Sequence, residues 1–320
     1  MEKVITNNAL KDKIIKRALT EGFQDIKFAR YQLLSEEINR YKEWIQKNNH
    51  ATMQWMERNL DKREDVALIL NSVKSVIVLS YNYYTGNIYP QNFNSDQGII
   101  SRYAWGSDYH EILEAKLKTI SGYINELSPN SISKYYIDTG PTLDKQWAVK
   151  SGLGWQGKNS LVISPKYGSY FFIALIFSNL EFDPDNQIKD YCGTCTKCID
   201  HCPTNAIVDS KIIDSNKCIS YWTIEAKPDI DIPEHIAENS NNRIYGCDIC
   251  QEVCPWNKHK PVITDELQFI SRFENGAISK SKIDQMEQDE FSAIFRKSPI
   301  KRLKLKGLKR NSRFLLKTEN

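Results

Sequence analysis

The chain has 320 residues, of which 41% are hydrophobic and 26% charged, a composition typical of a folded protein with one large or two ordinary domains. Its net charge is only +3. Its first eight residues lack a signal-peptide core, and its longest apolar run, residues 170–177, is shorter than the roughly 20 residues of a membrane span. We therefore expect a cytoplasmic protein without a membrane partner, in which clustered cysteines indicate metal.

The first part of the chain is predicted to be α/β or α+β from its hydrophobic periodicity. Helices are predicted over residues 11–21, 36–47, 109–127 and 143–151. Strands are predicted over residues 25–30, 75–84, 134–137, 161–164 and 169–177. The polar stretch 86–98 is predicted to be a loop, and a domain boundary is expected at the Asp-Pro-Asp-Asn run of residues 183–186.

All eight cysteines follow this boundary, in two motifs. The first is Cys192-x2-Cys195-x2-Cys198-x3-Cys202-Pro, and the second is Cys247-x2-Cys250-x3-Cys254-Pro with Cys218 upstream. In two-cluster ferredoxins, three closely spaced thiolates bind one cluster and the fourth cysteine of the run binds the other. We therefore assign one [4Fe–4S] cluster to Cys192, Cys195, Cys198 and Cys254, and a second to Cys202, Cys218, Cys247 and Cys250. The insertion of residues 219–246 separates Cys218 from its motif.

A zinc site or a disulfide framework would fit the cysteines less well. A zinc site formed by Cys192, Cys195, Cys247 and Cys250 leaves the other four cysteines and both Cys-Pro pairs unexplained. A disulfide framework conflicts with the missing signal peptide and with the chain length. Two clusters conduct electrons but do not catalyse a reaction, so two classes remain: an electron carrier, or a reductase with a second cofactor.

The chain ends in a basic segment. Residues 291–318 contain ten Lys or Arg and no Asp or Glu, which leaves a net charge of −7 on the rest of the chain. Such a tail is typical of proteins with a polyanionic partner, and a solvated basic end explains the charge about equally well.

Several blocks of sequence resemble epoxyqueuosine reductases, in the same order. Upstream blocks are Trp-Met-Glu-Arg-Asn at 55–59, Arg-Tyr-Ala-Trp-Gly-Ser-Asp-Tyr-His at 102–110, Asp-Thr-Gly-Pro at 138–141 and Gly-Leu-Gly-Trp-Gln-Gly-Lys-Asn at 152–159. The cysteine motifs at 192–207, 218–225 and 245–257 complete the match, so the resemblance covers roughly residues 10–315.

The resemblance implies an α+β protein with three parts. Residues 1–182 would be a cobalamin-binding α/β catalytic domain related to reductive dehalogenases, 183–260 a two-cluster ferredoxin-like module, and 261–320 a helical, basic segment. The protein would reduce epoxyqueuosine at the wobble position of a tRNA to queuosine. Many members of the family continue into helical repeats, so this chain resembles a short form.

The resemblance also assigns site residues. Asp138 matches the family's proton donor, although the residue by itself is typical of a turn or helix cap. Arg58 matches a cobalamin-contacting arginine, and Asp108 is also a good N-cap for the helix that follows it. Besides Arg58, the residues expected to bind cobalamin are Tyr103, Asp108, Asp138, Lys158, Asn159, Ser169, Ser220 and Asp248. No cobalamin motif with a histidine ligand is visible, so we expect base-off cobalamin.

Partners follow from the basic tail and from the same resemblance. The basic residues expected to hold the tRNA are Lys301, Arg302, Lys304, Lys306, Lys309, Arg310 and Arg313. We also expect an external low-potential electron donor and a monomer. The alternatives are a dehalogenase-like corrinoid enzyme acting on a small molecule and a ferredoxin-type electron carrier. The basic tail argues against the first, and the upstream blocks argue against the second.

Overall fold

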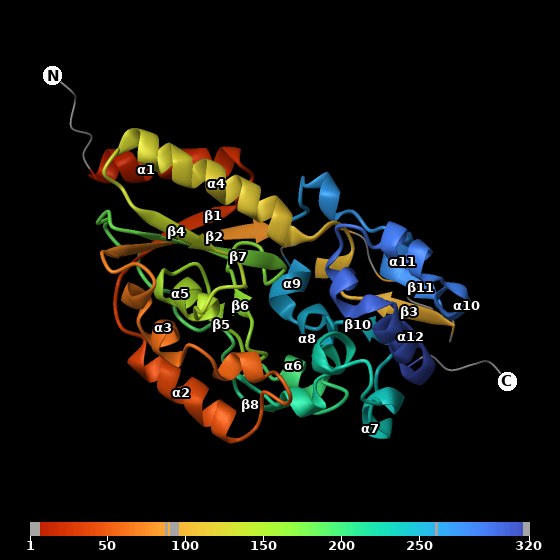
Figure 1. The fold of residues 1–320 in the computed structure, drawn as a ribbon. Coiled ribbons are helices and arrows are strands. Elements are labelled where there is room, and N and C mark those ends of the chain that lie inside the picture. The colour runs from red at the N-terminus through yellow and green to blue at the C-terminus, as the bar shows by residue number, and fades with distance from the viewer. Residues whose placement is uncertain (1–6, 87–88, 90–95, 260–261, 316–320) are drawn as a thin grey trace.

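The computed structural model describes residues 7–86, 89, 96–259 and 262–315 (Figure 1). Its largest sheet has four antiparallel strands in the order β1 (Asp25–Arg30), β2 (Ser75–Asn82), β7 (Phe171–Ser178) and β4 (Ser133–Tyr136). The two central strands are buried along almost their whole length, which suits their β-branched and aromatic residues. The α+β fold class is confirmed.

Helices cover both faces of this sheet, and alternate residues of β2 point to each (Figure 1). Ile77 and Leu79 share one core with α1 (Asn7–Thr20) and α4 (Tyr109–Leu127). Val76 and Val78 share another with Trp147 of α5 (Asp144–Lys150). On this second side also lie α2 (Ser35–Gln46), α3 (Leu60–Glu64), β5 (Trp155–Gln156) and β6 (Val162–Ile163). Helices α4 and α5 therefore pack on opposite faces of the main sheet.

A second core forms around a small sheet of distant segments. Strand β3 (Gln97–Ile100) pairs in parallel with β10 (Arg243–Tyr245) and antiparallel with β11 (Ala277–Ser279). The prediction of a loop over 86–98 is wrong at its end, where Gln97 and Gly98 belong to β3; residues 87–88 and 90–95 lie outside the described ranges. The accompanying helices are α7 (Glu234–Glu238), α10 (Lys280–Gln285), α11 (Gln288–Ile294) and α12 (Lys304–Leu315).

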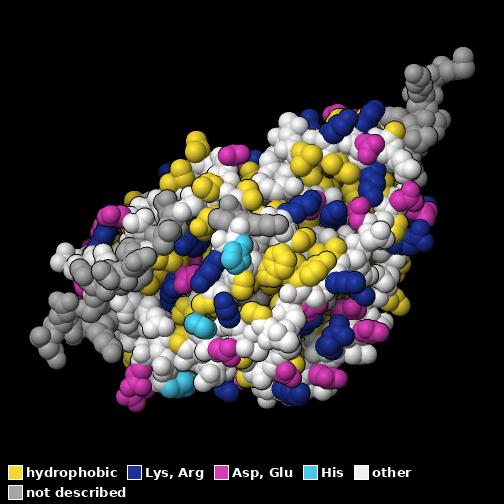
Figure 2. All heavy atoms as spheres, turned by 180° about the vertical axis from the view of Figure 1, so that it is seen from behind, with side chains coloured by type: hydrophobic (Ala, Val, Ile, Leu, Met, Phe, Trp, Pro, Cys, Tyr) yellow, Lys and Arg dark blue, Asp and Glu magenta, His cyan; other side chains and the backbone are white. Residues whose placement is uncertain are grey.

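The cysteine module lies between these two parts of the molecule (Figure 1). It contains the short elements α6 (Lys197–Asp200), β8 (Ile207–Asp209), β9 (Ile212–Ile213), α8 (Ile249–Glu252) and α9 (Pro255–His259). Figure 2 shows one face of the molecule, on which hydrophobic and basic side chains gather around a hollowed middle. Among the described residues, no helix has the length and apolar character needed to cross a membrane.

Candidate iron–sulfur and catalytic centre

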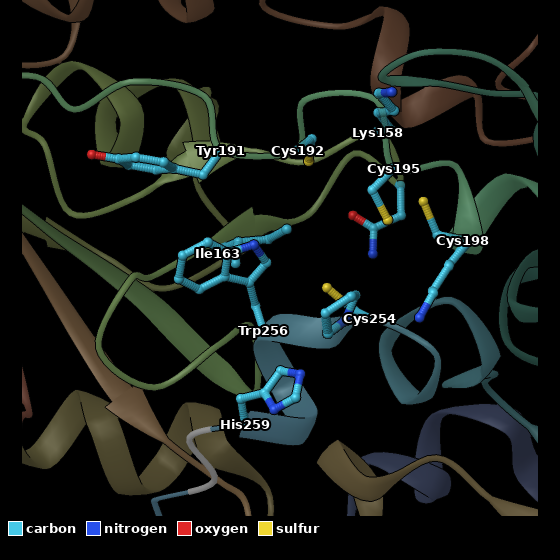
Figure 3. Close-up of a pocket in the computed structure, with 12 residues that line it drawn as sticks. Lys158, Ile163, Tyr191, Cys192, Cys195, Cys198, Cys254, Trp256 and His259 are labelled. Carbon is cyan, nitrogen blue, oxygen red and sulfur yellow. The ribbon is translucent and has the colours of Figure 1, made fainter.

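The first four cysteines of the crossed assignment surround one cavity. Cys192, Cys195, Cys198 and Cys254 line a space of about 350 Å³ (Figure 3). Burial raises the pKa of the Cys198 thiol to about 11, and the neighbouring Cys192 and Cys254 contribute to the rise. Burial also raises the pKa of Cys254, with contributions from Cys192 and Cys195. Although Cys254 is distant in sequence, α9 brings it to the first motif.

The other four cysteines form a second group. Burial raises the pKa of Cys250 well above that of a free thiol, and Cys247, Cys218 and Cys202 add to the rise. The four cysteines of the zinc alternative are thus divided between the two groups. Among the described residues, no three His, Cys, Asp or Glu side chains are placed to hold a single metal ion.

Donors point at the sulfur atoms of both groups. The indole N–H of Trp155 donates to Cys192 Sγ at 3.4 Å, and the backbone N–H of Ala206 donates to Cys202 Sγ at 3.2 Å. Such donors stabilise negative charge on sulfur and tune cluster potential. Two groups of four thiols, one of them around an open cavity and each with an N–H donor, fit four-iron clusters.

Asp248 fixes the loop of the second group. Its buried carboxylate accepts hydrogen bonds from the hydroxyls of Tyr89 at 2.8 Å and Ser101 at 2.5 Å, and from the backbone N–H of Arg102 at 2.8 Å. Because Asp248 lies between Cys247 and Cys250, these bonds anchor both thiols to the turn before α4. The carboxylate is fully engaged by the protein.

Three other predicted residues also lie beside this group. Asn159 donates to the carbonyl of Cys250 at 3.4 Å, and the Ser169 hydroxyl donates to Gln251 at 3.1 Å. The side chain of Ser220 hydrogen-bonds to the Cys218 thiol, which lowers its pKa against the larger effect of burial. The structure therefore gathers Asn159, Ser169, Ser220 and Asp248 around the second thiol group.

Asp138 lies on an exposed loop that follows β4. Its backbone has a φ of +57°, a left-handed conformation that Asp tolerates better than most residues. The Tyr109 hydroxyl donates to Asp138 Oδ2 at 2.7 Å. The backbone N–H of Asp138 donates to the Asp144 carboxylate, whose pKa burial raises to about 6. Asp138 does not cap α5, which starts after Leu143 without a side-chain cap.

Three tyrosines form a wall beside Asp138. The ring of Tyr103 lies 6.4 Å from that of Tyr109 and 6.2 Å from that of Tyr245, measured between centroids. Burial raises the pKa of all three phenols, that of Tyr245 to about 12, so each keeps its proton at neutral pH. Nearby, Asp108 accepts from the His110 backbone N–H at 3.0 Å, which confirms its role as the N-cap of α4.

Lys145 is a site residue that the sequence patterns did not indicate. Its side chain is exposed, yet desolvation lowers the pKa of its amine, while Asp138, Cys250 and Asp144 attract the charged form and oppose the shift. The Lys145 amine therefore lies near both Asp138 and Cys250 of the second thiol group. We name the place where these side chains approach one another the catalytic hollow. Only the position of Lys145, shortly after the Asp138 block, could have indicated it.

Two other predicted cobalamin contacts, Arg58 and Lys158, are not among the residues gathered around the second thiol group. Arg58 is exposed, and its carbonyl accepts from the guanidinium of the buried Arg63, which also donates to the carbonyl of Thr142 at 3.1 Å. Arg63 therefore ties the Arg58 segment to the Asp138 loop. Lys158 instead lines the cavity of the first thiol group, where its amine donates to the Gly193 carbonyl at 2.8 Å. It is not brought next to Asp138.

The basic tail is partly neutralised by the insertion of residues 219–246. Arg302 pairs with Glu225 at 2.5 Å, Arg313 pairs with Asp231 at 3.2 Å, and Lys306 pairs with Asp229. These acids lie about eighty residues earlier in the sequence, so the expectation of an unopposed basic surface is wrong for three of its seven members.

Arg310 is a further correction. It is only 4% exposed, and its guanidinium donates to the carbonyls of Trp222, Lys227 and Ile230 at 2.7–3.0 Å. A side chain used in this way cannot contact a tRNA phosphate, so the prediction for Arg310 is wrong. Its neighbour Asn311 donates to the carbonyls of Thr223 and Ile244. Helix α12 therefore holds the insertion whose ends carry Cys218 and Cys247.

Replacing Arg310 with Met should destabilise the protein and the second thiol group. Met keeps much of the length but leaves buried carbonyls unpaired, at roughly 1–3 kcal/mol for each. The matched control is Arg313→Met, because an exposed ion pair contributes only about 0–1 kcal/mol. Thermal unfolding together with iron analysis checks this, and equal melting temperatures for the two variants would show that Arg310 is not a structural brace.

Two groups of four thiols, with the carboxylic acid of Asp138 near the second, are typical of an enzyme that delivers electrons and a proton to one place. The class of protein is therefore clear: the chain is an iron–sulfur oxidoreductase. Residues 191–257 match the family model described as "4Fe-4S double cluster binding domain", and residues 63–139 match "Epoxyqueuosine reductase QueG, DUF1730". The epoxyqueuosine reductase of Cellulophaga algicola is 40% identical over 95% of this chain and 97% of its own length. That of Synechocystis is also 40% identical, over 87% and 94%. The chain belongs to the epoxyqueuosine reductase family.

Solved structures of the family share the fold. An epoxyqueuosine reductase with an epoxyqueuosine-modified tRNA-Tyr stem loop is 28% identical, with a TM-score of 0.89 over 97% of this chain and 82% of that one. The enzyme from Bacillus subtilis, solved with an aspartate-bearing catalytic loop swung out of the active site, is 27% identical, with a TM-score of 0.86 over 97% and 82%. The resemblance inferred from the sequence blocks is thus confirmed.

Proposed function

We propose that the chain reduces the epoxide of epoxyqueuosine in a tRNA anticodon to the alkene of queuosine. The reaction consumes two electrons and two protons and releases water. The observation that carries the proposal is the shared hollow, where Lys145 lies in the field of both Asp138 and Cys250. A proton donor and the inner end of an electron path therefore meet at one place, as this reaction requires. The family relatives support the choice of substrate.

Two [4Fe–4S] clusters would supply the electron path. We assign the first to Cys192, Cys195, Cys198 and Cys254, and the second to Cys202, Cys218, Cys247 and Cys250. The grouping of the thiols supports both sets. Each cluster passes one electron at a time, so two passages complete one turnover.

A cobalamin would occupy the hollow. The groups that approach one another there, Asp138, Lys145, Tyr103 and the Cys250 loop, come from separate elements, as the binding of a large flat group requires. When bound, it would supply a strongly reducing, nucleophilic centre next to the epoxide. We propose the base-off form without a histidine ligand. Arg58 lies on a segment that Arg63 holds to the same hollow.

Asp138 would protonate the oxygen that leaves the carbon ring. Tyr109 donates to Oδ2 of Asp138, which orients the carboxyl and leaves Oδ1 for the substrate. Because burial keeps Tyr109 protonated by raising its pKa, this bond persists through neutral pH. The aspartate-bearing catalytic loop of the Bacillus subtilis enzyme supports this role for an acid on a loop.

The tRNA would lie along the basic rim close to Asp108. Arg296, Lys301 and Lys304 are exposed around a hollow that Asp108 also lines. Phosphate contacts position RNA without reading its sequence, while an unpaired base can be splayed out and inserted into the catalytic hollow. We also retain the exposed Arg302, Lys306 and Arg313 as weaker contacts, because their ion pairs must exchange for phosphate.

Neutralising this rim should weaken tRNA binding in a salt-dependent way. With Arg296, Lys301 and Lys304 changed to Gln, three lost contacts should flatten the slope of log affinity against log salt by about 2. The comparison variant changes Arg302, Lys306 and Arg313 to Gln, and we expect a smaller effect because those side chains already pair with acids. Titration of tRNA at several salt concentrations checks this. Equal slopes in the rim variant and the unmodified protein would place the RNA on another surface.

The decisive experiment is a product assay. Protein purified without oxygen and loaded with iron, sulfide and cobalamin is incubated with epoxyqueuosine-containing tRNA and Ti(III) citrate, and the nucleosides are analysed by mass spectrometry. We expect queuosine only when cobalamin is included. Full loading of both cofactors without any queuosine would overturn the proposed function.

A further inference from the structure

The cavity of the first thiol group opens at the protein surface. Figure 3 shows Cys192, Cys195, Cys198 and Cys254 facing a space that Tyr191, Trp256 and His259 border. Tyr191 is 52% exposed, and His259 and Lys197 are exposed as well. A cluster held here would have protein on one side and solvent close to the other.

The second thiol group is tied to the interior of the protein by its loop. Asp248 and Gln251 are both buried; Asp248 accepts from Ser101 and from the backbone of Arg102, and Gln251 accepts from Ser169. On its inner side, Tyr245, two residues before Cys247, packs against Tyr103, whose ring lies beside Tyr109, the hydrogen-bond donor to Asp138. The two groups are therefore not equivalent: electrons that end in the hollow must enter at the first group.

The surface around the entry cavity is aromatic at its centre and basic at its edge. Trp155 packs edge-on against Tyr191 and Trp256, with ring centroids 5.3 and 4.8 Å away. The residues that line the cavity include Lys158, Lys197 and His259 and no acid. We call the surface formed by Lys158, Tyr191, Lys197, Trp256 and His259 the entry face.

Two acids lie beside or within the first cysteine motif in sequence, Asp190 and Asp200. Asp190 pairs with Lys211 at 2.8 Å and accepts from the Cys192 backbone N–H. Asp200 accepts from the Thr196 hydroxyl at 2.7 Å. Among the described residues, neither acid forms an ion pair with Lys158 or Lys197, and the charge of Asp190 is balanced by Lys211.

We propose that the entry face is the docking site of a small, acidic, one-electron carrier protein. The inference rests on the proposed function only in that the first group holds a cluster. In each encounter, the carrier's cofactor loses one electron and the cluster gains it; a second encounter supplies the second electron of the reaction. A basic rim steers an acidic partner, while a small aromatic centre lets the cofactors approach without a large, slowly dissociating interface.

Lys197→Glu tests the proposal, with Lys118→Glu as the matched control. Both lysines are exposed and both changes alter the charge by −2, but Lys118 lies on α4, which covers the opposite face of the main sheet from β5 and β6. The probes are a purified plant-type [2Fe–2S] ferredoxin and a flavodoxin, which share acidic surfaces and differ in cofactor. Binding of each oxidised carrier is measured by calorimetry, and cluster reduction by each reduced carrier is measured by stopped flow. Neither assay needs tRNA or cobalamin.

We expect Lys197→Glu to weaken binding and slow reduction by about tenfold at low salt, with little difference left at high salt. Lys118→Glu should behave as the unmodified protein, and Ti(III) citrate, which needs no docking, should reduce all variants equally. His259→Glu is a second test variant, in case Lys197→Glu disturbs the adjacent Cys198. Two results would overturn the proposal: equal affinities of both test variants and the control, or weakened binding of tRNA in place of the carriers. Normal carrier binding without queuosine formation would instead reject the proposed function alone.

Discussion

Replacing Asp138 with Asn should abolish most turnover while leaving the fold and both cofactors in place. The amide keeps the size of the side chain, and its oxygen can still accept the hydrogen bond from Tyr109. Asn also tolerates the left-handed backbone that Asp138 adopts, with a φ of +57°. The variant cannot, however, deliver an acidic proton to the departing oxygen. Because general acid catalysis typically contributes about 10²–10⁴-fold, we expect a loss in that range.

The measurement is single-turnover formation of queuosine, together with iron and corrinoid contents. Asp12→Asn is the matched control, because it makes the same change at an exposed carboxylate on α1, outside the proposed sites. It should lose little activity. Full activity in Asp138→Asn, with normal cofactor content, would reduce Asp138 to an ordinary loop residue and move the proton donor elsewhere.

Local patterns predicted most of the main sheet and its helices. The predicted strand at 25–30 and helix at 109–127 coincide with β1 and α4, and the helix at 36–47 differs from α2 by one residue at each end. Hydrophobic residues recur with a regular period in these segments, and in the folded protein the same residues are buried in the core. Strand β3 was missed because only two of its four residues are apolar aliphatics, and its partners β10 and β11 lie more than 140 residues later.

The same limit explains why cysteine spacing and charge patterns differ as signals for the site. Cysteine spacing is a local signal, and the known wiring of two-cluster modules extends it to Cys254. Charge patterns are different, because their meaning depends on what packs against them. The basic tail contained no acid in sequence, yet Glu225 and Asp231 lie against it in space. The only signal for Lys145 was its position shortly after the Asp138 block, since a lysine in the first turn of a short helix is ordinary until its neighbours in space are known.

Replacing Cys254 with Ser should remove the cluster that is bound by the first motif. Cys254 follows Cys250 closely in sequence, but its thiol joins the cavity of Cys192, Cys195 and Cys198. Loss of one ligand of four should therefore lower the iron content from about eight to about four atoms per chain. Cys250→Ser should produce the same loss of iron by removing the other cluster.

The two variants can be distinguished by how the remaining cluster is reached. In Cys254→Ser the inner cluster survives beside the catalytic hollow, so Ti(III) citrate should still support some queuosine formation while a carrier protein should not. In Cys250→Ser the outer cluster survives, so a carrier should still reduce it, but those electrons have no route to the hollow and no queuosine should form. Iron analysis, stopped-flow reduction and the product assay together check this. If Cys254→Ser behaved as Cys250→Ser does, Cys254 would bind the same cluster as Cys250, its neighbour in sequence, and the crossed ligand assignment would be wrong.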